Sequence, residues 1–203
     1  MIISAIENAA GSKYKFKVFI DDEFAFILYK GELSHYGLAV DMELSEELFS
    51  ELNEIVFKRG KEHLSKLICE KDRTEFEIRE NLKKHFYSDE NIERLTELAR
   101  DQGFVNDRLY ASDYVSCYAG RKSLAVIKAD LMRRGVSSEY ISLALEELSS
   151  DDEKEGIIKL LKKKYPDKEP LSYEEKNKLF AYLGRKGYSF ETIRKAFDEY
   201  ISD

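Results

Sequence analysis

The first forty residues alternate between apolar and polar positions in a way that predicts β-strands. In residues 14–20 an aromatic or aliphatic residue recurs at every second position, and a period of two is typical of a strand with one buried face. Asp21-Asp22-Glu23 interrupts this run, and a second apolar stretch follows over residues 24–29. This pattern predicts a β-hairpin with a short polar turn. Residues 2–6 are isoleucine-rich and are candidates for a third strand beside it.

From Ser45 onward the spacing of apolar residues becomes helical. Ser45 is followed by Glu46 and Glu47, a serine cap with acidic residues in the first turn, which favours a helix start at this point. The first proline of the chain is Pro166, and together with Pro170 it brackets a polar segment that we interpret as an exposed connection between helices. The remainder of the chain is therefore predicted to be helical.

Three segments of this helical region align with one another without gaps. They are residues 82–92, 131–141 and 183–193, roughly 50 residues apart, a spacing typical of helical repeat proteins. Each segment begins with a leucine: Leu82, Leu131 and Leu183. Each contains a serine placed to cap the second helix of a helix-turn-helix: Ser88, Ser137 and Ser189. The alignment predicts that one structural module occurs in three consecutive copies.

The residue that closes the first helix of each module is a glycine in two of the three copies. Gly135 and Gly187 occupy this position, and Phe86 stands there in the first copy. Helices commonly end on a residue in the left-handed conformation, for which glycine is preferred.

With one more helix upstream, each module consists of three helices. We therefore predict a mainly α fold made of tandem three-helix repeats, in three copies and elongated, behind a small β-hairpin-containing N-terminal region. The predicted domains are residues 1–56 (the β-hairpin region and a linking helix), 57–104 (repeat 1), 105–150 (repeat 2) and 151–203 (repeat 3).

Composition narrows the range of functions. The formal net charge is −7, whereas a free-standing duplex DNA-binding protein needs a basic excess or a concentrated basic face. No apolar stretch approaches the roughly 18 residues of a membrane-spanning helix, and no signal peptide is recognisable. Cys69 and Cys117 lack metal-binding spacing, which favours a reducing cytoplasm with both thiols buried as small hydrophobic groups.

The charges are unevenly distributed along the chain. Residues 41–54 hold six acidic residues and no basic one. Residues 121–134 hold five basic residues and a single acidic one, Asp130. The basic residues form our leading candidate contact surface, and the competing interpretation is an ordinary solvated helix face. They are Arg121, Lys122, Lys128, Arg133 and Arg134.

Two further patterns admit a functional and a structural interpretation. Gly184-Arg185-Lys186-Gly187 matches the loop with which KH domains clamp a nucleic-acid backbone, but the repeat alignment favours a helix end whose glycine is shared with the second copy. Arg185 and Lys186 remain candidate contact residues. Tyrosines recur at a spacing of four along one predicted helix, at positions 110, 114 and 118. Their rings could stack on nucleic-acid bases, but a stripe at this spacing more often forms the packed face of a helix, and we favour that interpretation.

The search for catalytic groups yields no recognisable motif. His35, His63 and His85 are isolated in the sequence and belong to no metal-binding pattern. Neither a phosphate-binding loop nor a nucleophile with a neighbouring base is recognisable. We therefore expect a protein that is not an enzyme and that needs no cofactor or metal.

The order of these motifs resembles that of a known family. Residues 105–115, then Gly120-Arg121-Lys122-Ser123, then residues 127–136 are similar to the central repeat of the RecX family, bacterial regulators of the RecA recombinase. Residues 19–26 are similar to the leading hairpin of longer members, and residues 183–190 to the last repeat. The resemblance thus covers nearly the whole chain.

The resemblance implies a cytoplasmic regulator that acts in homologous recombination, DNA repair and the SOS response. It would bind along the helical groove of a RecA filament on single-stranded DNA and inhibit strand exchange, ATP hydrolysis and the coprotease activity. A monomer and a weak direct DNA contact would be compatible with this role. The alternatives are a helix-turn-helix DNA-binding regulator, suggested by Arg133-Arg134-Gly135-Val136-Ser137-Ser138, and a scaffold for an unrelated protein.

Overall fold

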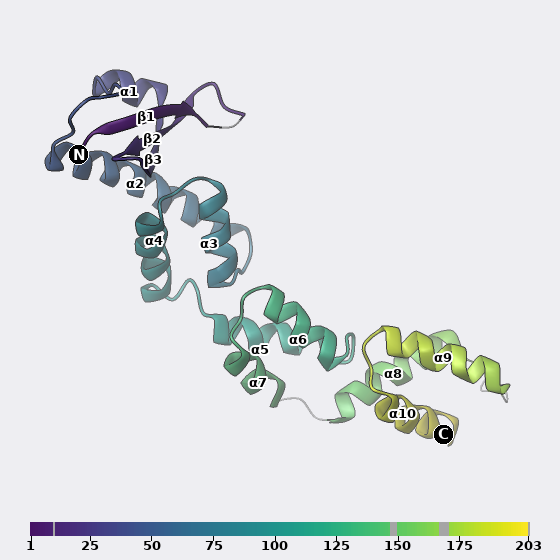
Figure 1. Ribbon diagram of the computed structural model, residues 1–203. Coiled ribbons are helices and arrows are strands. Elements are labelled where there is room, and N and C mark those ends of the chain that lie inside the picture. The colour runs from purple at the N-terminus through teal and green to yellow at the C-terminus, as the bar shows by residue number, and fades with distance from the viewer. Residues whose placement is uncertain (10, 147–149, 167–170, 203) are drawn as a thin grey trace. The chain divides into compact units, whose positions relative to one another are not determined.

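Figure 1 shows the computed structural model of the chain, which describes residues 1–9, 11–146, 150–166 and 171–202. Within those residues, three β-strands are followed by ten α-helices. The predicted mainly α fold with a small N-terminal β-hairpin region is therefore confirmed. The chain divides into two compact units, Met1–Val105 and Asn106–Asp203, which we call unit 1 and unit 2.

Unit 1 begins with a three-stranded antiparallel sheet. Its strands are β1 (Ile3–Asn8), β2 (Lys15–Ile20) and β3 (Glu23–Tyr29), paired in that order. The turn between β2 and β3 consists of Asp21 and Asp22, with φ values of 48° and 68°. Two successive left-handed residues match the twist of the flanking strands, and aspartate tolerates this conformation better than most residues. Both the hairpin and the third strand are confirmed.

Two helices follow the sheet. The short α1 (Lys30–His35) was not predicted, whereas α2 (Glu46–Glu70) begins as expected. The backbone amide of Leu48 donates to the Ser45 hydroxyl over 3.2 Å, which confirms the predicted cap. The first half of α2 packs Leu52 and Val56 against the sheet. Residues 56 and 57, which flank a predicted domain boundary, are therefore consecutive residues of one helix.

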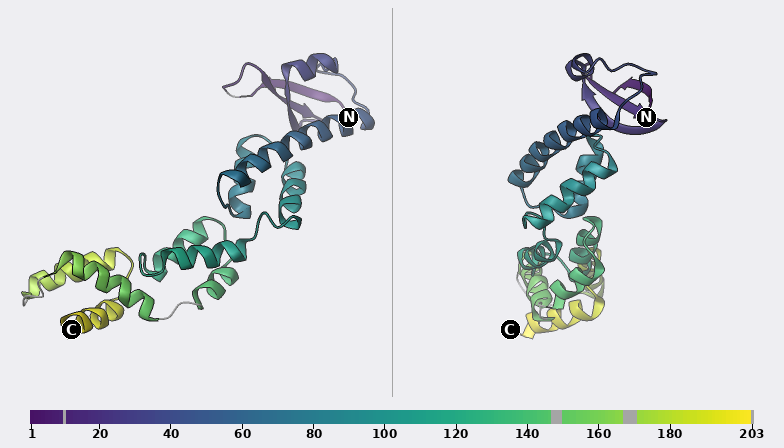
Figure 2. Two further views of the ribbon diagram at one scale, coloured as in Figure 1. Left: turned by 180° about the vertical axis from the view of Figure 1, so that it is seen from behind. Right: turned by 90° about the vertical axis from the view of Figure 1, so that its left-hand side faces the viewer.

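The second half of α2 forms the first three-helix repeat with α3 (Glu75–Lys84) and α4 (Asp89–Asp101). Seen from behind in Figure 2, α3 and α4 lie beside the end of α2. Their shared core includes Leu64 of α2, Leu82 of α3 and Leu95 of α4. A single continuous helix therefore contributes to two hydrophobic cores of unit 1.

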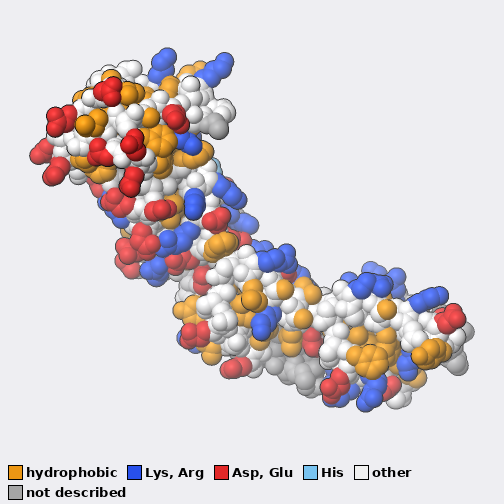
Figure 3. Space-filling model, in the orientation of Figure 1, with side chains coloured by type: hydrophobic (Ala, Val, Ile, Leu, Met, Phe, Trp, Pro, Cys, Tyr) orange, Lys and Arg blue, Asp and Glu red, His pale blue; other side chains and the backbone are white. Residues whose placement is uncertain are grey.

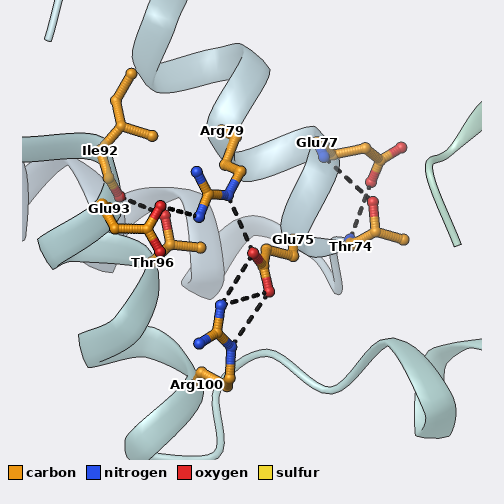
Figure 4. A network of polar contacts seen from close by, with 8 residues as sticks. All are labelled: Thr74, Glu75, Glu77, Arg79, Ile92, Glu93, Thr96 and Arg100. Carbon is orange, nitrogen blue, oxygen red and sulfur yellow. Dashed lines mark hydrogen bonds and ion pairs between the residues drawn. The ribbon is translucent and has the colours of Figure 1, made fainter. Parts of the chain in front are cut away.

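A polar network joins α3 to α4 (Figure 4). The Thr74 side chain accepts from the Glu77 amide over 3.2 Å, and the Glu77 carboxylate accepts from the Thr74 amide, so α3 starts with a capping box. Glu75 accepts from Arg79 of α3 and from Arg100 of α4, each over 3.0 Å. Burial alone would raise the pKa of the Glu75 carboxyl, but the two guanidinium groups outweigh it and lower that pKa. These arginines join α3 to α4, so they are poor candidates for partner contact.

Unit 2 contains the remaining two repeats. Repeat 2 consists of α5 (Asp107–Tyr118), α6 (Leu124–Arg133) and α7 (Ser138–Glu146). Repeat 3 consists of α8 (Ser150–Lys164), α9 (Tyr173–Arg185) and α10 (Phe190–Ser202). Each repeat encloses its own core, built around Val115 and Ile127 in repeat 2 and around Ile157 and Phe197 in repeat 3. The predicted proline-containing connection lies mostly in residues 167–170, outside the described residues.

The three aligned segments adopt the same local structure. The leucines at their first position are all fully buried: Leu82, Leu131 and Leu183. The predicted cap serines accept hydrogen bonds of 3.3, 3.3 and 3.1 Å from the amides of Asn91, Tyr140 and Thr192. Phe86, Gly135 and Gly187 have φ values of 61°, 78° and 88°. The phenylalanine thus takes the left-handed conformation that glycine takes in the other copies, and the predicted repeat is confirmed.

The two repeats of unit 2 meet through close backbone approaches. The Ser123 hydroxyl, at the start of α6, donates to the Lys186 carbonyl at the end of α9 over 2.9 Å. A Cβ atom added to Gly187 would lie 2.5 Å from the Ser123 Oγ. A Cβ atom added to Gly156 would lie 2.8 Å from the Gly120 carbonyl oxygen. Side chains larger than hydrogen are therefore excluded at both points of contact.

The predicted burial of the cysteines is wrong. Cys69 and Cys117 are free and both are exposed. Each lies two residues beyond a buried residue of its helix, Leu67 in α2 and Val115 in α5. Two residues correspond to a rotation of about 200° around a helix, which carries the thiol to the solvent side.

Candidate functional site

The first predicted basic cluster lies around α6 of unit 2. Arg121 and Lys122 precede the helix, Lys128 lies within it, Arg133 is in its last turn and Arg134 follows it. Arg121, Lys128 and Arg133 are exposed, whereas Lys122 and Arg134 are partly buried. The cluster therefore divides into outward-pointing cations and cations held against the protein.

Asp130 of α6 is the centre of the inner part of this cluster. Its carboxylate accepts from the Tyr114 hydroxyl over 2.9 Å and from the Lys122 ammonium over 2.7 Å, and it also pairs with Arg133. The side chain of Asp130 is only 13% exposed. The Lys122 ammonium also lies 3.9 Å from the centroid of the Tyr118 ring, a cation–π distance. Lys122 is therefore committed to internal contacts.

These contacts shift the pKa values of both partners toward the charged forms. The hydrogen bond from Lys122 is the main cause that lowers the pKa of the Asp130 carboxyl. The hydrogen bond to Asp130 is the main cause that raises the pKa of the Lys122 ammonium. Such mutual shifts mark a stabilising ion pair rather than a proton donor or acceptor for chemistry.

We expect Asp130→Asn to destabilise the protein by about 1 kcal/mol at pH 7, because a partly exposed ion pair contributes modestly and Lys122 loses its carboxylate. The folded-state pKa of Asp130 is below its unfolded value, so its contribution is complete above the unfolded pKa and disappears as the pH falls through the folded one. Urea unfolding at pH 7 and at pH 3 measures both effects. An equal difference between the variant and the natural protein at the two pH values would contradict this role.

The predicted tyrosine stripe is part of the packed face of α5. Tyr110, Tyr114 and Tyr118 are partly buried against the core of repeat 2. The ring centroids of Tyr110 and Tyr114 are 6.2 Å apart, and those of Tyr114 and Tyr118 are 4.5 Å apart. The Arg134 guanidinium lies 5.5 Å from the centroid of the Tyr114 ring. The tyrosine rings thus form an aromatic platform against which the two partly buried cations, Lys122 and Arg134, lie.

The second predicted basic pair lies at the end of α9. Arg185 is in the last turn and Lys186 caps the helix, and both are exposed. The amide of Lys186 donates to the Leu183 carbonyl over 3.0 Å, and that of Gly187 donates to the Gly184 carbonyl over 2.9 Å. Amides that complete the helix cannot also clamp a phosphate, so this segment is a helix end and not a KH-type loop.

The structure brings the α9 pair next to the start of α6. The Ser123 bond to the Lys186 carbonyl places residues 121–123 and 185–187 at one junction within unit 2. Arg133 and Arg134 lie at the opposite end of α6, a helix of 10 residues that spans about 15 Å. Figure 3 shows Lys and Arg side chains over both α6 and α9. The outward cations are Arg121, Lys128, Arg133, Arg185 and Lys186.

Two of the histidines, which are far apart in the sequence, lie side by side in the structure. His63 of α2 and His85, which caps α3, have ring centroids 4.4 Å apart. One feature of the sequence pointed to His85: it occupies the same position in its repeat as the candidate contact residues Arg134 and Lys186. His63 lies outside the aligned segments, so the alignment could not identify it as a neighbour.

The acidic stretch of residues 41–54 lies in unit 1. All six of its acidic side chains are exposed, and Figure 3 shows acidic groups gathered over the part of unit 1 that carries α1 and the start of α2. Glu51 accepts a hydrogen bond of 2.8 Å from the Tyr36 hydroxyl. In the described part of the chain there is no group of three or more His, Cys, Asp or Glu side chains able to hold a metal ion. None of the described helices is long and apolar enough to cross a membrane.

Comparison with known proteins shows which proteins this chain is similar to. Residues 151–197 match the family model described as "RecX, third three-helix domain". The chain is 30% identical to the regulatory protein RecX of Clostridium beijerinckii, over 98% of this chain and 96% of that protein. It is also 30% identical to RecX of Caldanaerobacter subterraneus subsp. tengcongensis, over 98% of each.

Solved structures share the fold. A crystal structure of regulatory protein RecX matches with a TM-score of 0.65 and 23% identity, covering 97% of this chain and 98% of that one. RecX from Lactobacillus salivarius matches with a TM-score of 0.63 and 24% identity, over 71% of this chain and 96% of that one. The full-length relatives are named as regulatory proteins, and neither they nor the family model indicates an enzyme. The chain belongs to the RecX family of regulatory proteins.

Proposed function

We propose that this protein binds RecA filaments on single-stranded DNA and inhibits their recombinase, ATPase and coprotease activities. The observation that carries the proposal is the similarity to RecX proteins over 98% of the chain. We infer from the same role a cytoplasmic location and a monomeric state. The predicted domain boundaries after residues 56, 104 and 150 stay part of the proposal. In it, repeats 2 and 3 are the modules that bind the filament.

The exposed cations of unit 2 support a charge-based contact. Arg121, Lys128 and Arg133 point outward from repeat 2, and Arg185 and Lys186 from repeat 3. Charges at the edge of an interface mainly guide encounter and fix register. Acidic side chains of the filament, and phosphates of its DNA, are the groups such a surface would meet. Lys122 and Arg134 would act indirectly, through the aromatic platform of α5.

Hydrolysis of ATP by RecA on single-stranded DNA tests the proposal. Addition of this protein should lower the hydrolysis rate in a dose-dependent way. If saturating amounts left the rate unchanged, the proposed function would be abandoned.

Charge reversal tests the surface. We expect Arg121→Glu combined with Lys128→Glu to raise the half-inhibitory concentration about tenfold, because each reversal replaces an attraction with a repulsion. Lys13→Glu combined with Lys58→Glu makes the same change of net charge on exposed residues of unit 1 and should leave inhibition unchanged. Equal weakening by both pairs would mean that net charge, and not this surface, determines binding.

The alternative of a helix-turn-helix DNA reader has weaker support. The second helix of such a motif enters the major groove and needs groups that contact bases and phosphates. In repeat 2 that helix is α7, whose sequence SEYISLALE contains two glutamates and no lysine or arginine. Tight binding to duplex DNA alone, with a steep dependence on salt, would nevertheless favour the alternative.

A further inference from the structure

A recess in unit 1 is lined by five ring side chains. It has a volume of about 370 Å³ and lies between β3, α2 and the turn that joins α3 to α4. The histidine rings 63 and 85 are 4.4 Å apart, and the His63 ring is 5.8 Å from that of Tyr87. Phe86 and Tyr29 complete the set. Flat rings from three separate elements therefore border one space.

The same recess carries an excess of positive charge. Lys15 of β2 and the α2 residues Arg59 and Lys66 line it, against one carboxylate, Glu62. Arg59 is paired with Glu32 and donates to the Ile27 carbonyl over 3.1 Å. Neither Lys15 nor Lys66 forms an ion pair with any residue in the described ranges. Two ammonium groups without a carboxylate partner therefore border the recess, and that of Lys15 lies 5.7 Å from the centroid of the Tyr29 ring.

The electrostatic environment of His63 reflects this charge. Burial is the main cause that lowers the pKa of the His63 imidazole, and the nearby charges of His85, Lys66 and Lys15 lower it further. Glu70 acts in the opposite direction. The recess thus disfavours another positive charge and would favour an anion.

We propose that this recess binds a nucleotide, that is, a phosphate group joined to an aromatic base. Its volume lies within the range of small-molecule sites. The ammonium groups of Lys15 and Lys66 supply partners for the phosphate. Cations already lie over the rings of Tyr29 and Phe86, so the two histidine rings are the faces on which a base would stack. An acidic peptide would use the lysines but would leave the rings without a matching partner. The proposal is independent of the RecA-directed function.

Binding of an anion should be coupled to protonation of His63. A phosphate next to the imidazole favours its charged form, so binding should raise the His63 pKa. The groups that face His63 come from four elements: Arg59, Glu62, Lys66 and Glu70 of α2, Lys15 of β2, Tyr29 of β3, and His85 and Tyr87 of the α3–α4 turn. Imidazole is the one side-chain type among these groups whose ordinary pKa lies between 6 and 7.5.

Imidazole NMR of the full chain tests the proposal directly, because the sequence contains three histidines. Titration with deoxyadenosine monophosphate should shift the signals of His63 and His85 in a saturable way and raise the His63 pKa. The signal of His35, which packs on Tyr36 outside the recess, should stay in place. Inorganic phosphate should bind at least about tenfold more weakly, because it lacks the stacking contribution. Unmoved His63 and His85 signals, or equal affinity for phosphate, would overturn the proposal.

Variants and alternative ligands complete the test. Lys15→Gln combined with Lys66→Gln should weaken binding about tenfold, whereas Lys58→Gln, an exposed lysine of α2 outside the recess, should not. Unchanged binding by the double variant would count against the site. Tighter binding of oligothymidylate than of the mononucleotide would identify the ligand as part of a strand, and the reverse would identify a free nucleotide; both support the proposal. Preferential binding of a glutamate-rich peptide would instead make the recess a protein-docking site and refute it.

Discussion

Gly187→Ala is expected to destabilise unit 2 by about 2–3 kcal/mol, because two separate costs add. The residue has a φ of +88°, a conformation that L side chains rarely adopt. The added Cβ atom would also lie 2.5 Å from the Ser123 Oγ and 3.0 Å from a methyl group of Val126. Moving Ser123 away breaks its bond to the Lys186 carbonyl and loosens the junction of repeats 2 and 3. The midpoint of urea unfolding measures the loss.

Gly184→Ala is the matched control, three residues earlier in the same segment. Gly184 lies inside α9, its φ is not positive, and an added Cβ atom would meet no atom within 4 Å. The same chemical change should therefore raise stability there by about 0.5–1 kcal/mol, the helix preference of alanine over glycine. Opposite signs at the two positions would support the role of Gly187 at the junction. Similar effects of both substitutions would refute it.

Local signals predicted much of this fold from the sequence. The cap at Ser45, the three cap serines and the closing positions at Gly135 and Gly187 all depend on residues close together in the chain. Such preferences act within one turn of backbone, so a sequence pattern can reveal them. The same position in the first copy is filled by Phe86, and it adopts the same left-handed φ. The turn of the repeat therefore imposes this conformation even where the residue is not glycine.

The short helix α1 and the full length of α2 were not predicted from the sequence. The six residues of α1 include no buried side chain, so no apolar period marks them. Its start is fixed instead by the Glu32 carboxylate, which accepts from the Tyr29 amide. The length of α2 was also missed, because its apolar residues face the sheet around Leu52 and the first repeat around Leu64. The sequence pattern showed the two faces without showing that one helix carries both.

The candidate surface was predicted only as a set of charges. The sequence could not show that Lys122 is held against the protein while Arg121 is exposed, because the groups that bind Lys122 include Tyr114 of the preceding helix α5. The contact between His63 and His85 likewise depends on how α2 packs against the α3–α4 turn. Pairings between distant residues follow from tertiary packing, which a local pattern does not encode. Which cations are free for a partner is therefore information that only the structure supplies.

Leu131→Ala is expected to lower the free energy of unfolding of unit 2 by about 3 kcal/mol, within the range for leucine removed from a close-packed core. The Leu131 side chain is fully buried in the core of repeat 2, where Val115 and Ile127 are also buried. The substitution removes three methylene-equivalent groups and leaves a cavity that the rigid helices can fill only in part. Urea unfolding followed by circular dichroism at 222 nm, the wavelength of the helix signal, measures the change.

Met132→Ala provides the neighbouring control, since Met132 is 57% exposed on the same helix; it should change stability by no more than about 0.5 kcal/mol. The repeat extends this prediction to two more residues, because Leu82 and Leu183 are also fully buried at the equivalent positions. Alanine at either should cost a similar amount in its own repeat, since the same turn encloses each leucine. A small loss at one of the three would show that this repeat does not depend on the leucine as the others do, and the structural equivalence of the copies would then not extend to their energetics.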